Sequence, residues 1–166
     1  MSTAGPSGDV LAIADREEAV EATVTLVAGA RRRIRILSRV LDPGLYDDPR
    51  VLEALRVFAT STTDAEVRLL VLDATAIQRT HAPLLALAQR LPSVFQFREL
   101  ADPVDRARAD AFVATDNGGC YHREFGHRFE GEARLHGAGR ARQLCEAFDP
   151  VWERSRPCNE LRALGL

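Results

Sequence analysis

Apolar positions along the chain alternate between helical and strand spacing, and this alternation predicts an α/β domain. Helical spacing or a helix-start signal marks four stretches: residues 15–33, a helix that begins at Asp48 and Pro49, residues 80–91 and residues 140–152. Strands are predicted at residues 34–38, 67–73, 94–100, 111–115 and 120–124, with residues 130–135 as a candidate for one more. Asp15 and Asp48 are placed to cap their helices, and we expect the arginine run at residues 31–33 to close the first helix.

The order of these elements predicts how the sheet is built. Helices and strands alternate up to residue 100, which favours parallel strands joined by crossover helices. The Asp-Asn-Gly-Gly stretch at residues 116–119 is a hairpin signal, so antiparallel strands follow. We expect a mixed, mostly parallel sheet flanked by helices on both faces, with a kink or restart at Pro150 in the last helix. The predicted organisation is a disordered tail over residues 1–8 and a single domain over residues 9–166.

Composition narrows the chemistry that this domain can perform. All 22 basic side chains are arginine, which closes mechanisms that need a deprotonated or compact lysine amine. A net charge of −2 supplies no general basic field, so we expect nucleic acid not to be a partner. No segment resembles a secretory signal or a membrane span, and three cysteines without metal or disulfide spacing favour a reducing compartment. We therefore expect a cytoplasmic protein with no membrane partner.

Polar residues follow several predicted strands, at the edge where ligands bind in open α/β sheets. The candidates are Ser38, Arg39 and Asp42 after the first strand, Asp73, Arg79 and His81 after the second, and Asp116 beyond the fourth. Arginine at this edge suits a phosphate, because the guanidinium is a forked donor that stays charged. The alternative is structural, with the two aspartates capping loops and Arg79 pairing with one of them.

A second concentration of reactive side chains lies at residues 120–128. Cys120 and His122 share one face of a predicted strand and are candidates to share a metal ion with His127, His136 or Cys145. The spacing fits no zinc signature, so the alternative of ordinary surface or half-buried histidines is favoured. We expect neither a metal nor a cofactor.

Residues 30–38, 41–43, 66–73 and 109–119 together resemble one repeat of the phospholipase D-like superfamily. The likeness covers residues 15–156, and the chain is also similar to uncharacterised bacterial domains. The superfamily motif is histidine, any residue, lysine, four residues, aspartate. When its aspartate is aligned on Asp116, Ala109 takes the histidine position and Ala111 the lysine position. The family's downstream Gly-Ser pair falls at Arg123 and Glu124.

The resemblance implies a scaffold whose reactive positions are empty. In active members the histidine is the nucleophile and the lysine holds phosphate oxygens, and two alanines perform neither role. The resemblance therefore implies a non-catalytic domain, a pseudoenzyme, kept for dimerisation or partner docking. Because active members build one site from two repeats, it also implies a homodimer.

Two hypotheses about ligands follow. The first is a residual phosphate pocket, centred on Arg79, His81 and Arg123, with candidate ligand residues Ser38, Arg39, Arg79, His81, Asp116 and Arg123. The alternative is a phosphodiesterase or phosphatase-type hydrolase that uses His81 or His122 with Asp116 or Asp73. That alternative requires a histidine and a carboxylate within about 2.6–3.2 Å of each other in a shared cleft.

Overall fold

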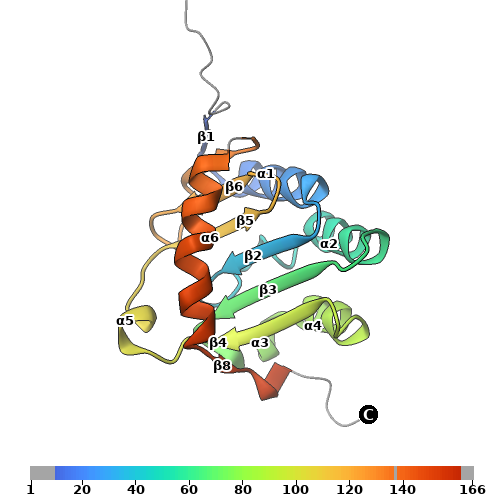
Figure 1. Cartoon of the computed structure of the whole chain (residues 1–166), viewed down its shortest axis with the longest axis vertical. Helices are drawn as coiled ribbons and strands as arrows, with labels where there is room; N and C mark the ends of the chain where they lie inside the picture. Colours follow the sequence, from blue (N-terminus) through green and yellow to red (C-terminus); the bar gives the residue numbers. More distant parts are fainter. Residues whose placement is uncertain (1–9, 137, 162–166) are drawn as a thin grey trace, which may run out of the picture.

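The computed structural model describes residues 10–136 and 138–161, so the tail predicted at residues 1–8 lies outside the described residues. One eight-stranded sheet runs through the molecule in the order β1-β7-β6-β5-β2-β3-β4-β8 (Figure 1). The strands are β1 (Val10–Ile13), β2 (Arg33–Leu37), β3 (Glu66–Val71), β4 (Phe95–Glu99), β5 (Ala111–Thr115), β6 (Cys120–Arg123), β7 (Gly131–Arg134) and β8 (Arg156–Pro157). The helices are α1 (Arg16–Gly29), α2 (Pro49–Ser61), α3 (Ala74–Thr80), α4 (Ala82–Arg90), α5 (Pro103–Arg106) and α6 (Ala138–Glu153), with a 3-10 turn η1 (Asn159–Leu161).

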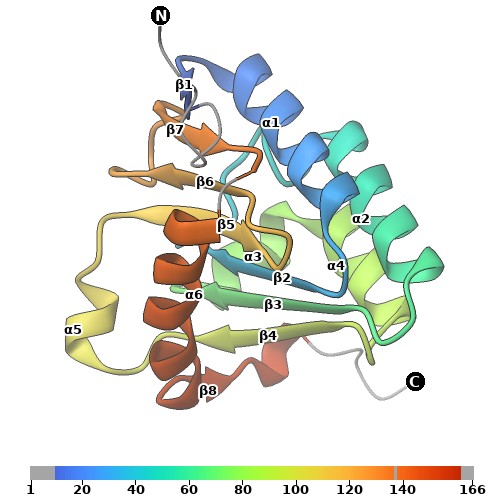
Figure 2. The same cartoon turned by 45° about the horizontal axis from the view of Figure 1, so that its top comes forward.

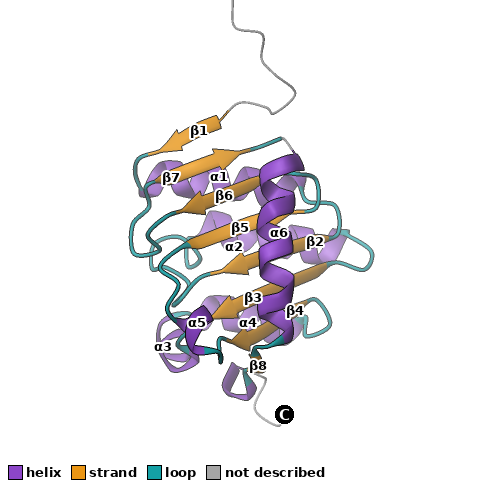
Figure 3. Cartoon of the chain, turned by 60° about the vertical axis from the view of Figure 1, so that its left-hand side comes forward, coloured by secondary structure: helices purple, strands orange, loops and turns teal. Residues whose placement is uncertain are grey.

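Helices cover both faces of the sheet, as the sequence predicts. Helices α1, α2 and α4 lie on one face, and α6 crosses the other face alone (Figures 2 and 3). Each face has its own apolar core, the larger beneath α1 to α4 and the smaller beneath α6. Because strand β3 is covered on both sides, Val67, Leu69 and Leu70 are all fully buried.

The prediction of a mostly parallel sheet is wrong. Of the strand pairs in the described ranges, only β2 with β3 and β3 with β4 are parallel; the other five are antiparallel. After β4 the chain passes through α5 and returns to the middle of the sheet, where β5 pairs antiparallel with β2. Strands β6, β7 and β1 then extend the sheet by antiparallel pairing, so only the β2-β3-β4 part has crossover topology.

Both predicted helix starts are confirmed, but the predicted end of the first helix is wrong. The carboxylate of Asp15 accepts the Glu18 N–H and that of Asp48 accepts the Arg50 N–H, as helix caps do. Helix α1 ends at Gly29, before the arginine run. The arginine run instead leads into the sheet: the Asp116 carboxylate accepts the backbone N–H groups of Arg31 and Arg32, and Arg33 begins β2.

Other element boundaries also differ from the sequence prediction. The helix predicted at residues 80–91 corresponds to α4, whereas α3, which precedes it and meets it at His81, was not predicted. Strands β1 and β8 and the short helix α5 were not predicted, because each is too short to show periodicity. Helix α6 continues through Pro150 to Glu153 rather than restarting there. Over the described ranges, no helix has the length and apolar character needed to cross a bilayer.

Candidate functional site

The candidate site lies at the carboxyl end of β2, where the sequence analysis places the candidate ligand residues. Ser38 follows β2 directly, and its hydroxyl donates to Asp42 Oδ2 over 3.0 Å. Leu41, next to Asp42, has a positive φ of 54°, which is uncommon for a residue with a branched side chain. This tight turn brings the Asp42 carboxylate back over the end of β2, and both Ser38 and Asp42 are buried.

Arg123 completes the cluster from the end of β6. Its guanidinium donates to Asp42 Oδ2, to the carbonyl oxygen of Gly126 at 2.9 Å and to that of Arg128 at 3.3 Å. The side chain is only 1 % exposed, and its Nε has no hydrogen-bond partner in the described part of the chain. Ser38, Asp42 and Arg123 are called the buried cluster below.

The charges of the buried cluster support one another. Burial lowers the pKa of Arg123, but Asp42, together with Tyr46 and Tyr121, outweighs burial and raises the pKa overall. Burial also raises the pKa of Tyr46, whose phenol lies near both charges. The Arg123 guanidinium lies over the Tyr121 ring at 5.6 Å. The cluster is therefore a closed ion pair with aromatic walls.

The two motif positions of the phospholipase D-like alignment lie beside this cluster. Ala111 opens β5 and pairs across the hairpin with Arg123, whereas Ala109 is exposed just before the strand. Gly126 donates its N–H to the Ala109 carbonyl over 2.7 Å, and a Cβ on Gly126 would lie 3.3 Å from the Ala111 Cβ. The backbone of Gly126 thus packs directly against Ala111, where a longer side chain would extend.

His81 lies near the buried cluster but is not hydrogen-bonded to it. The imidazole is completely buried where α3 meets α4, and neither ring nitrogen has a hydrogen-bond partner among the described residues. Burial lowers the pKa of His81, and the charge of Asp47 opposes that shift. Backbone groups of Val40 and Leu41 lie near the ring without completing a hydrogen bond. His81 is therefore a neutral buried imidazole.

The residues of the predicted phosphate pocket differ in their exposure to solvent. Arg79 is exposed in the last turn of α3, while His81 and Arg123 are buried. Arg39 is exposed and donates to the Arg108 carbonyl over 3.0 Å. The structure does not bring these arginines into one open pocket.

Asp73 and Asp116 bind backbone N–H groups, which is the structural role given as the alternative to ligand binding. Neither carboxylate pairs with Arg79 in the described residues. Asp73 caps α3 by accepting the Ala76 N–H over 2.9 Å. The two oxygens of Asp116 accept the backbone N–H groups of Arg31 and Arg32, each over 2.9 Å. Both carboxylates are thus occupied away from any histidine.

His122 instead pairs with Asp110, a residue that the sequence analysis did not single out. The distance from His122 Nε2 to Asp110 Oδ2 is 3.3 Å, and Arg108 donates two further hydrogen bonds of 2.9 Å to the same carboxylate. Burial raises the pKa of Asp110, but the hydrogen bonds from His122 and Arg108 outweigh burial and lower it overall. The register of the hairpin could have predicted this pair. Phe112 lies opposite His122, and Asp110, two residues before Phe112, is therefore the diagonal neighbour of His122 on the same face.

Metal-binding residues do not gather in the described ranges. No three of their histidine, cysteine, aspartate and glutamate side chains are close enough to hold an ion. Cys120 and Cys158 are buried and Cys145 is half-buried, all three as free thiols. Burial raises the pKa of Cys120, so its thiol is a poor ligand and a poor nucleophile at neutral pH.

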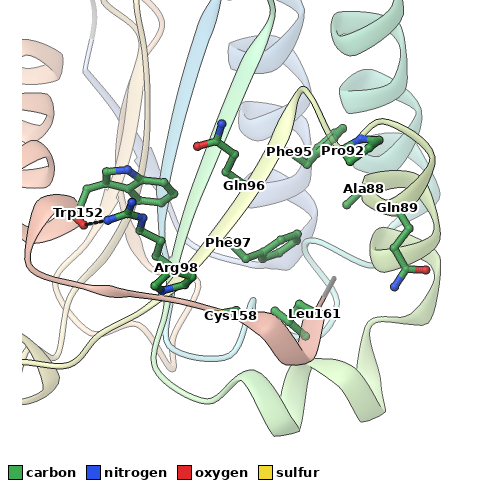
Figure 4. A pocket seen from close by; sticks show the side chains of 11 residues that line it. Ala88, Gln89, Pro92, Phe95, Gln96, Phe97, Arg98, Trp152, Cys158 and Leu161 are labelled. Carbon is green, nitrogen blue, oxygen red and sulfur yellow. Dashed lines mark hydrogen bonds between the residues drawn. The ribbon is translucent and has the colours of Figure 1, made fainter. Parts of the chain in front are cut away.

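Two hollows of the surface lie elsewhere. One is an apolar groove between α1 and α2, and the other lies at the outer edge of β4 (Figure 4). Neither is lined by Ala109, Ala111 or any member of the buried cluster.

Solved structures show what the fold resembles. The chain is similar to Nuc, a phospholipase D family member from Salmonella typhimurium, with a TM-score of 0.64 and 12% identity over 93% of this chain and 99% of Nuc. NucT from Helicobacter pylori matches with a TM-score of 0.63 and 8% identity over 90% of this chain and 98% of NucT. TrmBL2, an archaeal chromatin protein, matches with a TM-score of 0.65 and 11% identity over 95% of this chain. The chain spans only 57% of TrmBL2, whose structure is described as showing a novel mode of DNA binding.

At these identities the likeness shows the phospholipase D-like fold and nothing about activity. A comparison with functionally curated proteins gave no significant match. A family model described as a domain of unknown function, DUF7931, matches residues 15–164. The chain therefore belongs to the DUF7931 family.

Proposed function

We propose that this protein is a non-catalytic phospholipase D-like domain that acts by binding, through dimerisation or partner docking. The observation that carries the proposal is the buried cluster beside Ala109 and Ala111. Where the alignment puts a nucleophile and a phosphate-binding amine there are two methyl groups, and the adjacent buried space holds an ion pair of the chain's own side chains.

The hydrogen bonding of Arg123 supports this reading. Its terminal nitrogens already bind one carboxylate oxygen and two backbone carbonyls, and the side chain is almost fully shielded from water. A phosphate at this place would have to displace Asp42 and leave that carboxylate buried without a partner, which costs several kcal/mol. The closed ion pair therefore argues against a residual phosphate pocket at Arg123.

The competing proposal is a hydrolase that uses His122, and one contact favours it. Asp110 lies within reach of His122 Nε2, so a carboxylate orients a histidine that is still partly exposed to solvent. Such a pair is a general base in many hydrolases. Against it, Asp110 also binds Arg108 with both oxygens, and neither of the two hollows described above contains His122.

A hydrolysis assay separates the two proposals. We expect purified protein to release no 4-nitrophenol from bis(4-nitrophenyl) phosphate above the rate of the His122→Ala variant at the same concentration. Activity that is lost in His122→Ala, and kept in a variant of the exposed His136, contradicts the non-catalytic proposal. Added phosphate or sulfate tests the residual pocket separately: we expect no rise in melting temperature, and a rise that Arg123→Met abolishes would establish that pocket.

The proposal extends to the setting of the protein. The homodimer rests on the resemblance to active members, which need two repeats. A bacterial origin rests on the resemblance alone, and a cytoplasmic location is supported by free cysteines at all three positions.

A further inference from the structure

The β5-β6 hairpin carries a sequence that is prone to spontaneous modification. Asn117 is followed by Gly118, and this is the only asparagine-glycine pair in the chain. Because glycine has no Cβ, its backbone nitrogen can approach the Cγ carbon of the preceding asparagine side chain. A bond forms between that nitrogen and Cγ, the side-chain nitrogen leaves as ammonia, and water opens the cyclic imide to aspartate or isoaspartate. The net reaction, deamidation, consumes one water and releases one ammonia.

In the folded chain, hydrogen bonds hold both ends of the Asn117 side-chain amide. Its Nδ2 donates to the carbonyl oxygen of Gly29, the last residue of α1. Its Oδ1 accepts the Thr115 hydroxyl over 2.7 Å and the Gly119 N–H over 3.0 Å. The attack draws Cγ toward the backbone nitrogen of the next residue and pulls the amide away from these partners. The reaction therefore works against three hydrogen bonds of the native hairpin.

The attacking nitrogen is held as well. The Gly118 N–H must lose its proton before its nitrogen can act as a nucleophile. This N–H donates to the Thr115 carbonyl over 3.3 Å, and Gly118 is buried. Burial restricts the access of a base from solvent, so the fold disfavours both partners of the reaction.

The contact with α1 depends on the small size of Gly29. A Cβ at this position would lie 2.7 Å from Asn117 Nδ2, closer than folded proteins allow. The atom in its way is the end of a side chain, so Gly29→Ala should displace the amide rather than the backbone. Because the two residues are 88 positions apart, this change leaves the asparagine-glycine pair itself untouched.

Deamidation would remove the contact between the hairpin and α1. Both products carry a carboxylate in place of the amide, and a carboxylate has no N–H to donate to the Gly29 carbonyl. The new negative charge also lies next to Asp116, whose oxygens accept the N–H groups of Arg31 and Arg32 just before β2. The modified hairpin therefore cannot restore its original contacts, and the change is irreversible.

We propose that Asn117 is a deamidation site that the native fold protects and that reacts when the hairpin opens. A molecule that has stayed open for long enough then carries a permanent chemical change and is less stable than before. This inference concerns the ageing of the chain and does not rest on the binding role proposed above.

The rate of deamidation in the full chain tests the protection. It is measured by mass spectrometry of proteolytic peptides after incubation at mildly alkaline pH, with and without urea. We expect the rate at Asn117 to be at least about tenfold lower in the native protein than in urea, because only the open hairpin reacts. Native Gly29→Ala should react several-fold faster than the native parent. The control is Gly139→Ala, where a Cβ meets no atom within 4 Å, and it should react at the parent rate. In urea all three chains should react equally.

Substitution tests the effect of the product. We expect Asn117→Asp to lower the melting temperature by about 2–4 °C, since it replaces the hydrogen-bond donor that faces the Gly29 carbonyl by an acceptor. Asn159→Asp, at an exposed position of η1, is the control for the added charge and should melt close to the parent.

Three results would overturn the inference. They are equal rates at Asn117 in the native protein and in urea, equal rates in native Gly29→Ala and Gly139→Ala, and an Asn117→Asp melting temperature no lower than that of Asn159→Asp. If Gly29→Ala does not fold, the first and third comparisons still decide. None of these results bears on the hydrolysis assay or on the mass in solution, so this inference can fail while the non-catalytic proposal stands.

Discussion

At the scale of single residues, the most informative contrast is between what the motif positions hold and what surrounds them. Ala111 is fully buried against the chain's own backbone, and Arg123 is held by Asp42 beside it. The space beside position 111 is filled by the backbone of Gly126 and by the buried ion pair. Under the proposed non-catalytic role, placing histidine at position 109 and lysine at position 111 should therefore not by itself create a catalytic site.

The two motif alanines should respond very differently to the same substitution. We expect Ala111→Lys to lower the free energy of unfolding by more than about 3 kcal/mol, because it forces a charged chain into a packed, buried position. Ala109→Lys is the matched control at an exposed position and should stay within about 0.5 kcal/mol of the parent. Urea denaturation at neutral pH measures both, and equal effects would show that position 111 opens onto solvent.

His81 should make stability depend on pH. Its pKa is lowered on folding, so below the ordinary value of about 6.5 the unfolded chain binds a proton that the folded chain does not. The folded state therefore loses stability as pH falls from about 6.5 toward the folded pKa. We expect His81→Leu, which also removes two unpartnered polar atoms, to gain stability relative to the parent between pH 7.5 and 5.

The control for this comparison is His136→Leu at an exposed position, which should follow the parent at every pH. Thermal unfolding at several pH values is sufficient to measure the difference. A constant difference between His81→Leu and the parent over this range would mean that His81 titrates normally in the folded protein.

At the scale of elements, α6 stands out because it covers one face of the sheet alone. Phe148 and Trp152 stack at 5.8 Å beneath it, and the guanidinium groups of Arg68 and Arg98 each lie 5.0 Å from the centre of the Trp152 ring. These cation–π contacts fix the carboxyl-terminal end of α6 over β3 and β4. The same end carries Pro150, which removes one helical N–H.

Replacement of this proline should stabilise the helix. We expect Pro150→Ala to raise the free energy of unfolding by about 1–2 kcal/mol, since the helix already continues through this position and Pro150 is exposed. Calorimetry measures the change. Glu146→Ala, one turn earlier on the exposed surface, is the control and should change little. A loss of stability in Pro150→Ala would show that α6 needs a bend to reach Trp152's position.

The elements also show how far sequence reasoning reaches. Capping aspartates and apolar runs predicted α1, α2 and the central strands, because each has a local cause. Helix α3 was missed because its seven residues are too few to show an apolar period. Asp110 was missed because it contacts His122 only as a diagonal neighbour across the hairpin. The ion pair of Asp42 with Arg123 was missed because these residues are 81 positions apart in the sequence and only the fold brings them together.

At the scale of the whole molecule, a sheet with the phospholipase D-like fold presents different surfaces at its two ends. The β1 end exposes Val10 and Leu11, whereas the opposite end carries the hollow at the outer edge of β4.

We expect the protein in solution to be a homodimer. Light scattering at micromolar concentration should give a mass of twice 18.3 kDa. A mass of one chain would refute the dimer.

Strand β5 occupies the centre of the sheet although it is made late, after more than 100 residues have emerged. Until it arrives, β2 has only β3 as a neighbour and its other side is an open hydrogen-bonding edge. During synthesis, the early β2-β3-β4 unit is therefore a partial sheet in which β2 is an exposed, apolar edge strand that can pair with another chain. This edge stays exposed until β5 is made and pairs with β2. A product terminated near Leu100 lacks β5 and is expected to aggregate rather than fold.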